Sequence, residues 1–366
     1  MMEGNGSRSG RSEEEVLDAI EERRRRPRRK ILDEQITLSH GAGGKSSHDL
    51  IEALFLRELR NPLLEPLADS AVIGDGEDRL AFTTDSFVVR PLFFPGGDIG
   101  ELAVNGTVND LSMAGARPIA LSSGFILEEG MPVADLDRIV SSMARAAEAA
   151  DVQVATGDTK VVERGKADGL YINTSGVGTI EHTLDLGPGS VRAGDRVIVS
   201  GSIGDHGMAI MIARGELALE VELESDTAPL NGLVADLLAA THGVRCLRDP
   251  TRGGLATVLA ELALSAQLGI TIDEASLPIR PEVNGACEIL GIDPLYVANE
   301  GKLVAIVDPE AEEDALTALR SHPLGADAVT VAEVRPEPPG LVLLETSFGG
   351  SRVVDMLAGD PLPRIC

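Results

Sequence analysis

Tryptophan is absent from the sequence, and aromatic residues make up only 2% of its 366 positions. The cores must therefore be packed from aliphatic side chains, and hydrophobic residues, at 43% of the chain, are numerous enough to do so. No apolar run approaches the ~20 residues that span a bilayer, and no apolar signal core follows the arginines near the N-terminus. We therefore expect a globular, cytoplasmic protein without a membrane partner. A chain of this length is long for one core, which predicts two domains.

Cysteine is scarce as well. Cys246, Cys287 and Cys366 have neither a metal-binding spacing nor the even number of a disulfide framework, so we expect reduced thiols. Cys246 and Cys287 lie among apolar neighbours and are interpreted as inert core residues. Cys366 differs, because it follows two prolines in the terminal stretch "PLPRIC", which disfavour helix and inner strand. It is either a presented thiol or a residue that stands last by chance, and this feature alone leaves both interpretations open.

Positive charge is in deficit, with a formal net charge of −27. Phosphate backbones bind clustered cations, so this balance argues against general nucleic-acid binding. The exception is "RRRRPRRK" at residues 23–30, which could bind an anionic surface. Residues 1–30 hold nine basic and seven acidic side chains, a net of only +2. We therefore interpret residues 1–34 as a solvated, disordered extension.

Apolar periodicity predicts a mixture of helices and strands in two units. Residues 35–59 are expected to form a strand, a glycine-rich turn and a helix, and the first unit to extend over 35–185. A hinge at "LGPGSVRAGD" would lead into a second unit over 190–346, whose last strand ends near Thr346, with a mobile tail at 347–366. The other predicted strands are 78–89, 152–162, 169–180, 196–201, 269–274, 302–307 and 340–346; the other predicted helices are 99–116, 135–150, 230–241, 253–268, 310–321 and one from Met208.

Two glycine-rich stretches suggest nucleotide-binding loops without matching their patterns. "HGAGGKSS" (40–47) has a serine, Ser39, where a P-loop requires its first glycine. Its backbone could still form an anion-binding nest at a helix start. "GSIGDHG" (201–207) has the spacing G-x-x-G-x-x-G instead of G-x-G-x-x-G, so a tight strand-to-helix turn is the better interpretation.

A set of aspartates is the more informative feature: Asp75, Asp85, Asp110, Asp158 and Asp249 all lie at expected strand ends, in turns or within helices. Each alone could be an ordinary cap or turn residue. Asp85 and Asp110, however, lie inside apolar segments, where a carboxylate is costly unless it is paired or binds a metal. Several convergent carboxylates suit Mg²⁺, which takes oxygen ligands and bridges to phosphates. The residues alone leave the ordinary and the metal-binding interpretations open.

Ten stretches together resemble one family. They are "HGAGGK", "TTDSFVV", "PLFFPGGDIG", "NGTVNDLSMAGA", "LSSGFILEEG", "GDTKVV", "SGSIGDHG", "RDPTRGGLATV", "ANEGKLV" and "PLPRIC". The family is the HypE hydrogenase maturation factors, within the superfamily of aminoimidazole ribonucleotide synthetase, selenophosphate synthetase and thiamine-monophosphate kinase. The resemblance runs from about Ile36 to Cys366. It implies an α+β fold of two domains, in which the N-terminal α+β domain pairs its sheet across a homodimer and a C-terminal α/β domain packs on it, followed by a flexible C-terminal tail.

The resemblance also implies an activity. The thiol of Cys366 would accept a carbamoyl group from the partner HypF, and the protein would dehydrate it to a thiocyanate with ATP and Mg²⁺. The cyanide would then pass to iron held by the HypC–HypD complex, for the nickel–iron hydrogenase centre. A flexible tail would let one thiol visit all three places.

Site residues follow from the same resemblance. Asp75, Asp85, Asp110 and Asp249 would be Mg²⁺–ATP ligands, with Asp78 as the alternative to Asp75. The remaining implied residues are Asn109 and Asp158 at the nucleotide, Gly43, Gly44 and Lys45 over its phosphates, and Glu300 and Lys160 beside the sulfur. Removing two N–H protons from a carboxamide needs a base. We favour Glu300, because a lysine at its usual pKa is protonated at pH 7, with Lys160 orienting the group or stabilising charge.

Two rival functions remain. A phosphotransferase of the selenophosphate-synthetase kind would place a Cys or selenocysteine in the glycine-rich loop, and "HGAGGK" has none. A carrier that presents the thiol without catalysis would not need Glu300, Lys160 or the aspartates, and Cys366-dependent ATP turnover would exclude it.

Overall fold

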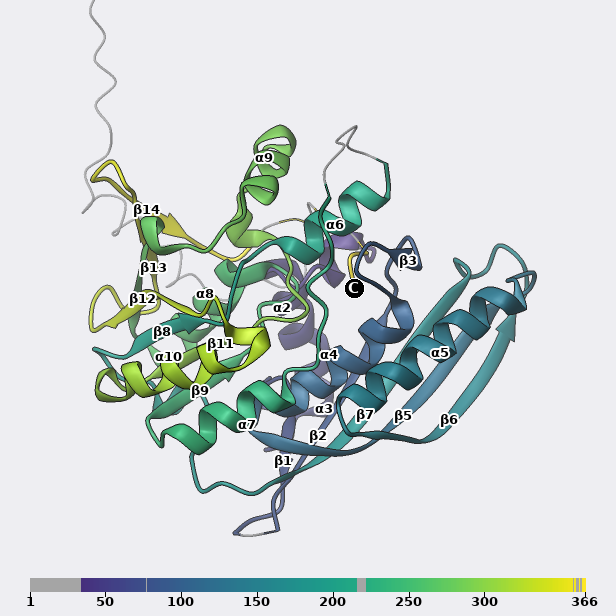
Figure 1. Ribbon diagram of the computed structural model, residues 1–366, viewed down its shortest axis with the longest axis horizontal. Helices are drawn as coiled ribbons and strands as arrows, with labels where there is room; N and C mark the ends of the chain where they lie inside the picture. Colours follow the sequence, from purple (N-terminus) through teal and green to yellow (C-terminus); the bar gives the residue numbers. More distant parts are fainter. Residues whose placement is uncertain (1–33, 77, 216–221, 358, 360–361, 363) are drawn as a thin grey trace, which may run out of the picture.

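The computed structural model describes residues 34–76, 78–215, 222–357, 359, 362 and 364–366, and the expected N-terminal extension lies outside them except for Glu34. Two sheets dominate this part of the chain, with a five-stranded sheet in the N-terminal half and a seven-stranded sheet in the C-terminal half (Figure 1). None of the helices described combines the length and apolar character that crossing a bilayer requires.

The five-stranded sheet has the order β1-β2-β7-β5-β6. Helices α4 and α5 cover one of its faces (Figure 1). The Asp98 side chain starts α4 by accepting hydrogen bonds from the first amide groups of the helix. The elements are β1 (Ala71–Ile73), β2 (Leu80–Phe87), β5 (Ala116–Glu128), β6 (Gln153–Val162), β7 (Leu170–Ile180), α4 (Ile99–Met113) and α5 (Val133–Ala149), with a small hairpin of β3 (Phe93–Phe94) and β4 (Gly97–Asp98).

The other face of this sheet, which we call the open face, is exposed. Side chains alternate along each strand, so Asp85 points toward α4 while Phe82 and Ser86 point outward. The open face carries four large apolar side chains, Ile73, Leu80, Phe82 and Ile126, that are 37–46% exposed.

The seven-stranded sheet has the order β14-β13-β10-β12-β8-β11-β9, in which only β10 and β13 pair in parallel. Alternate strand residues pack against α8 on one face and against α7 and α10 on the other. The strands are β8 (Arg196–Val199), β9 (Val244–Arg248), β10 (Gly269–Asp273), β11 (Val304–Val307), β12 (Val329–Arg335), β13 (Val342–Glu345) and β14 (Ser351–Val354). The helices are α6 (Asp205–Ala213), α7 (Asn231–Ala240), α8 (Gly254–Ala266), α9 (Pro281–Leu290) and α10 (Glu312–Ser321), with 3₁₀ turns η3 (Pro188–Ser190), η4 (Glu274–Ser276), η5 (Pro294–Tyr296), η6 (Pro309–Ala311) and η7 (Pro323–Gly325).

The strand predicted at the start of residues 35–59 is wrong. Residues Leu38–Gly41 form a 3₁₀ turn, η1, because Thr37 and His40 bond each other locally through the His40 Nδ1 atom. The predicted helix follows as α2 (Lys45–Leu50), a π-helical stretch η2 (Ile51–Leu56) and α3 (Arg57–Leu59).

The prediction that the last strand ends near Thr346 is also wrong, because β14 pairs antiparallel with β13 after a turn at Thr346–Gly350. Seven further strands and helices escaped the periodicity analysis: β1, β3, β4, β5, β9, α9 and β12. The other predicted strands and helices are present, with ends shifted by a few residues.

Candidate active site

Buried carboxylates from both halves of the chain meet beneath the inner side of β2. Asp85 comes from β2, Asp110 from α4 and Asp249 from the turn after β9. Burial raises the pKa of Asp110 well above its ordinary value, and the charges of Asp249, Asp85 and Asp69 raise it further. The Thr83 hydroxyl donates to Asp110 Oδ2 at 2.8 Å and opposes this shift. These four aspartates, which we call the carboxylate cluster, therefore hold more negative charge than the surrounding protein neutralises.

Asp69 belongs to the cluster although the sequence analysis missed it. The Arg248 guanidinium lies 3.0 Å from Asp69 and 3.2 Å from Glu261, so its positive charge is shared. Burial, and then the charge of Asp69, raises the pKa of Asp249 to about 7, while Arg248 opposes the shift. Arg248 and Arg252, which lowers the pKa of Asp85, are outnumbered by the carboxylates, so the cluster stays short of positive charge.

This donor set suits a magnesium ion, because hard cations prefer carboxylate oxygens and relieve such a deficit. Among the described residues, no three carboxylates converge closely enough to form a ready-made metal site. Asp75 and Asp78 lie in the exposed turn between β1 and β2, with Asp78 N–H donating to Asp75 O at 3.3 Å. The structure thus brings three of the four predicted metal ligands together and leaves Asp75 outside.

Glu300 lies beside the cluster, 3% exposed. Two hydrogen bonds fix its backbone. Its N–H donates to Asp226 Oδ1 at 3.0 Å, and its carbonyl accepts from Asn109 Nδ2 at 3.0 Å. Its Oε1 atom has no hydrogen-bond partner among the described residues. Burial first, and then the charges of Asp85, Asp249 and Asp226, raise the pKa of Glu300 well above its usual range. A buried carboxylate with an unused acceptor can take up a proton or bind a ligand.

Arg252 is the functional candidate that sequence reasoning missed, although the stretch "RDPTRGG" contains it. Its Nη1 donates to the Gly41 carbonyl at 2.9 Å. The charge of Cys366, followed by those of Asp85, Glu300 and Asp110, raises the pKa of Arg252. Arg252 therefore links the glycine-rich loop, the C-terminus and the carboxylate cluster.

The glycine-rich loop packs between Arg252 and the base of the tail. Gly43 has a φ of +74°, and a side chain there would approach Arg252 Cβ to 2.6 Å. A side chain at Gly44 would collide with the Leu357 carbonyl, which accepts a hydrogen bond from Lys45 N–H at 2.8 Å. The Lys45 side chain is exposed. Both glycines are thus explained by close packing, and a role at the phosphates stays a prediction.

Asn109 is buried, and its side-chain amide makes three hydrogen bonds within the protein. Nδ2 donates to Ala228 O at 3.1 Å as well as to Glu300 O, and Oδ1 accepts from Leu230 N–H at 2.8 Å. Both amide hydrogens of Asn109 are thus engaged within the protein, and its contact with a nucleotide stays a prediction. The geometry instead fits Asn109 as the residue that fixes the Glu300 loop to α4.

Asp158 and Lys160 lie on the edge strand β6, away from the cluster. Lys160 Nζ is 2.6 and 2.8 Å from the Asp158 carboxylate oxygens, and both side chains are 69% exposed. The strand registers place Asp158 in one cross-strand row with Gly124, Asn173 and Ser86 on the open face. Strands three apart are separated by about 14 Å, so Lys160 does not reach Ser86 or Glu300 within one chain.

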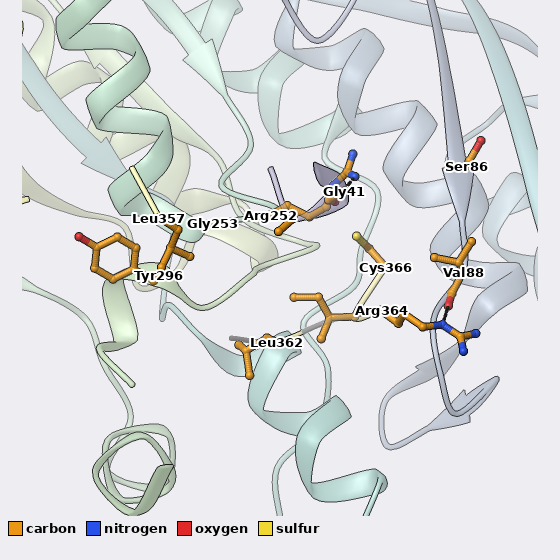
Figure 2. Close-up of a pocket in the computed structure, with 12 residues that line it drawn as sticks. Gly41, Ser86, Val88, Arg252, Gly253, Tyr296, Leu357, Leu362, Arg364 and Cys366 are labelled. Atoms are coloured by element: carbon orange, nitrogen blue, oxygen red, sulfur yellow. Dashed lines mark hydrogen bonds between the residues drawn. The ribbon is translucent and has the colours of Figure 1, made fainter. Parts of the chain in front are cut away.

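The C-terminal residues pack back onto the protein. Leu362 and Ile365 are buried with residues of α4 and α6, and Val88 N–H donates to a main-chain carboxylate oxygen of Cys366 at 3.1 Å. Cys366 lines a cavity of about 70 Å³ together with Arg252 and other residues (Figure 2). The predicted mobility of the tail stays a prediction, and the structure shows Leu362 and residues 364–366 packed against the protein.

The other two cysteines are buried, and burial raises the pKa of both thiols to about 12. Such thiols remain protonated and unreactive at neutral pH. Their interpretation as core residues is confirmed, and no disulfide joins the three cysteines.

Comparison with known proteins identifies the family. The family models "AIR synthase related protein" match with their N-terminal domain at residues 67–180 and their C-terminal domain at 192–343. A curated relative named carbamoyl dehydratase HypE, from Rhodobacter capsulatus, is 56% identical over 92% of this chain and 99% of its own.

Solved structures agree. A chain from a crystal structure of a HypE–HypF complex is 48% identical with a TM-score of 0.81, over 84% of this chain and 99% of that one. A chain from a crystal structure of the hydrogenase maturation protein HypE in complex with ATP is 47% identical with a TM-score of 0.77, over 91% and 100%. The chain therefore belongs to the HypE family of carbamoyl dehydratases, within the AIR synthase superfamily.

Proposed function

We propose that this protein uses ATP to dehydrate a carbamoyl group carried on the Cys366 thiol, giving an S-cyanide that supplies cyanide ligands to the iron of a nickel–iron hydrogenase. The observation that carries the proposal is the position of Cys366, in a cavity shared with Arg252, whose pKa is raised both by Cys366 and by the carboxylates Asp85, Glu300 and Asp110. The names of the similar chains, a carbamoyl dehydratase and a HypE bound to ATP, support it.

The reaction balances as thiocarboxamide plus ATP giving thiocyanate, ADP and phosphate. The carboxamide oxygen is a poor leaving group, so it first takes the γ-phosphoryl group of ATP and then leaves as phosphate. Phosphoryl transfer depends on positioning and on neutralising charge. Arg252, permanently charged, interacts electrostatically with both Cys366 and the carboxylate cluster and would neutralise the phosphoryl group.

The reaction also releases both N–H protons of the carboxamide: the departing phosphate takes up one of them, and the proposed acceptor of the other is Glu300. It is buried, its Oε1 is unused among the described residues, and the bond to Asp226 holds its backbone in place. A raised pKa brings a carboxylate closer to the range in which a base works near neutral pH.

The nucleotide site is proposed on the same residues. Asp85, Asp110 and Asp249 would hold Mg²⁺, which supplies charge neutralisation at the ATP phosphates when bound. The glycine-rich loop with Gly43, Gly44 and Lys45 would lie over the phosphates.

A homodimer is proposed because the open face carries large exposed apolar residues in a sheet that is otherwise packed. It would also give Asp158 and Lys160 a role: they share the open face with Ser86, which lines the Cys366 cavity. Lys160 of a second copy could approach this cavity, whereas Lys160 of the same chain could not.

Replacing Phe82 with aspartate tests the dimer. A charge at this position would have to be buried unpaired in the interface, so we expect the variant to sediment as a monomer while the wild type is a dimer. The control is Phe348→Asp, at a phenylalanine that is 98% exposed in the β13–β14 turn. Equal sedimentation of the two variants would contradict the proposed interface.

Two partners complete the proposal. A similar chain was solved in complex with HypF, and we propose HypF as the source of the carbamoyl group. The HypC–HypD complex is proposed as the acceptor of the cyanide. Delivery to either partner requires the tail to leave the cavity that it occupies in the structure.

The function can be tested by separating loading from dehydration. Cyanate carbamoylates accessible thiols, so treatment with cyanate should load Cys366 without any partner or nucleotide, while the buried Cys246 and Cys287 serve as internal controls. After desalting, we expect mass spectrometry of the C-terminal peptide to show loss of one water only when Mg²⁺–ATP is added. A carbamoyl group that persists with ATP would leave a thiol carrier and reject the dehydratase.

A further inference from the structure

A buried histidine holds the peptide carbonyl next to Cys366. His206, the second residue of α6, is 0% exposed. Its Nε2 lies 2.6 Å from the Ile365 carbonyl oxygen, and its Nδ1 lies 2.7 Å from Ser225 Oγ. The ring also packs edge-on against Phe94, at 5.7 Å between centroids. Protein groups therefore fix the ring on three sides.

The hydrogen-bond partners determine the tautomer of His206. A carbonyl oxygen can only accept, so Nε2 carries the proton and donates it to Ile365. Ser225 Oγ accepts from Thr227 N–H at 3.1 Å, which leaves its own hydroxyl proton to donate to Nδ1. Burial lowers the pKa of His206, although Asp226 and the Ile365 bond oppose the shift, and the neutral ring matches this arrangement. Ser225 therefore sets the tautomer that binds the tail.

Arg364, the residue before Ile365, also anchors the C-terminal residues. Its guanidinium pairs with Asp168 and donates from Nε to the Val88 carbonyl at 3.1 Å. Its backbone has a φ of +57°, a conformation that is uncommon for a residue with a side chain, and its carbonyl accepts from Arg90 N–H at 3.2 Å. The contacts of the Arg364 side chain are only half-buried, whereas the His206 hydrogen bond lies in the core.

We propose that His206, oriented by Ser225, is the positioning residue that keeps the carbamoylated terminus in the cavity during dehydration and has no part in loading the thiol. The inference rests on the proposed function. His206 bonds the backbone one residue before Cys366, so it acts on where the thiol lies and not on the reacting atoms. When the tail leaves, the Nε2 proton loses its partner in a buried site, which favours return of the tail.

The test uses the full-length protein with His206→Ala, Ser225→Ala and His206→Gln. Alanine at either position removes the donor or its orientation, while the glutamine amide can still donate to a carbonyl and accept from Ser225. The matched control is His242→Ala, at an exposed histidine of the α7–β9 turn. Thermal unfolding of each variant shows whether it is folded, and Ser225→Ala keeps the ring in place should His206→Ala unfold.

Two rates are measured on each protein. Alkylation of Cys366 by iodoacetamide reports how often the thiol leaves the cavity, and Mg²⁺–ATP-dependent loss of water from cyanate-loaded protein reports dehydration. Loss of one hydrogen bond weakens docking by about five- to tenfold. We therefore expect the two alanine variants to be alkylated faster and to dehydrate more slowly, with the two fold-changes multiplying to about this factor. Cyanate loading should not slow, and His206→Gln should recover part of both effects.

The outcomes separate this inference from the proposed function. Failure of the wild type to dehydrate would reject the function, whereas the alkylation rates would still report the hold on the tail. Wild-type alkylation rates in both alanine variants would overturn the role of His206, and so would slower dehydration without faster alkylation, because His206 would then act on something other than docking.

Discussion

Replacing Cys366 with alanine should abolish formation of the S-cyanide and leave ATP binding intact. The thiol is the only part of Cys366 that the proposed chemistry uses, whereas docking depends on backbone and neighbouring groups. Val88 N–H donates to the main-chain carboxylate of Cys366, and Leu362 and Ile365 supply the buried apolar contacts. We therefore expect the variant to bind ATP within about twofold of the wild type in calorimetric titration, with no cyano mass on its C-terminal peptide.

The matched control for this variant is Cys287→Ala. Cys287 is buried in the same core, and its pKa of about 12 makes it unreactive. The control should therefore form the cyano product at the wild-type level after allowance for any loss of stability. Loss of ATP affinity in Cys366→Ala would mean that the side chain has a structural role, and a cyano mass on any other residue would reassign the reacting thiol.

The carboxylate cluster was partly predictable, for a physical reason. Asp85 and Asp110 stood out because a charged side chain inside an apolar segment must be compensated, and the structure places both, half-buried, beside other carboxylates. Asp69 gave no such signal, because it lies in an irregular segment between α3 and β1. Only the fold brings Asp69 to Arg248, 179 positions later in the chain.

Arg252 shows a different limit of sequence reasoning. An arginine in a turn is ordinarily solvated, and its spacing from Asp249 contains no information about Cys366. The left-handed glycines after it, Gly253 with φ +77° and Gly254 with φ +61°, allow the tight turn into α8. A side chain at Gly254 would lie 2.5 Å from the Leu295 carbonyl. This close packing, too, is evident only in the folded structure.

The strands that the sequence analysis missed have only a weak alternation of apolar and polar residues. β5 contains proline and several small residues in "ARPIALSSGFILE", and both of its neighbours in the sheet compensate for this low propensity by pairing. β14 is short and follows a glycine pair, and its apolar residues are few. The strand wrongly expected near residue 36 failed for the opposite reason, because local bonds between Thr37 and His40 favour a turn.

Lys160 and Glu300 were predicted in one site, but they lie far apart within one chain. The resemblance placed Lys160 beside Glu300, yet strand alternation puts it on the open face and Glu300 on the side of the carboxylate cluster. Lys160 and Glu300 can belong to one site only if the open face of a second copy completes it. The sequence of one chain predicts the residues of such a site but not which copy supplies each of them.

Replacing Glu300 with glutamine should reduce the rate of dehydration by about 10²- to 10⁴-fold, the usual effect of removing a general base. Glutamine keeps the shape of the side chain and cannot accept a proton. Because a buried carboxylate that lacks a partner is costly, the variant should fold at least as well as the wild type. Single-turnover conversion of cyanate-loaded protein measures the effect, and Glu313→Gln, at an exposed glutamate of α10, is the control.

The pH dependence distinguishes a base from a merely structural carboxylate. Burial and the neighbouring carboxylates raise the pKa of Glu300, so at low pH Glu300 is protonated and cannot accept a proton. The wild-type rate should therefore rise as pH increases through this raised pKa, above the usual range of glutamate, and reach a plateau beyond it. Glu300→Gln should lose both the rate and this rise, whereas Glu300→Asp should keep the rise at a lower rate. A pH-independent wild-type rate, or a rise that persists in Glu300→Gln, would assign the proton transfer to another group, of which Lys160 from a second copy is the first to test.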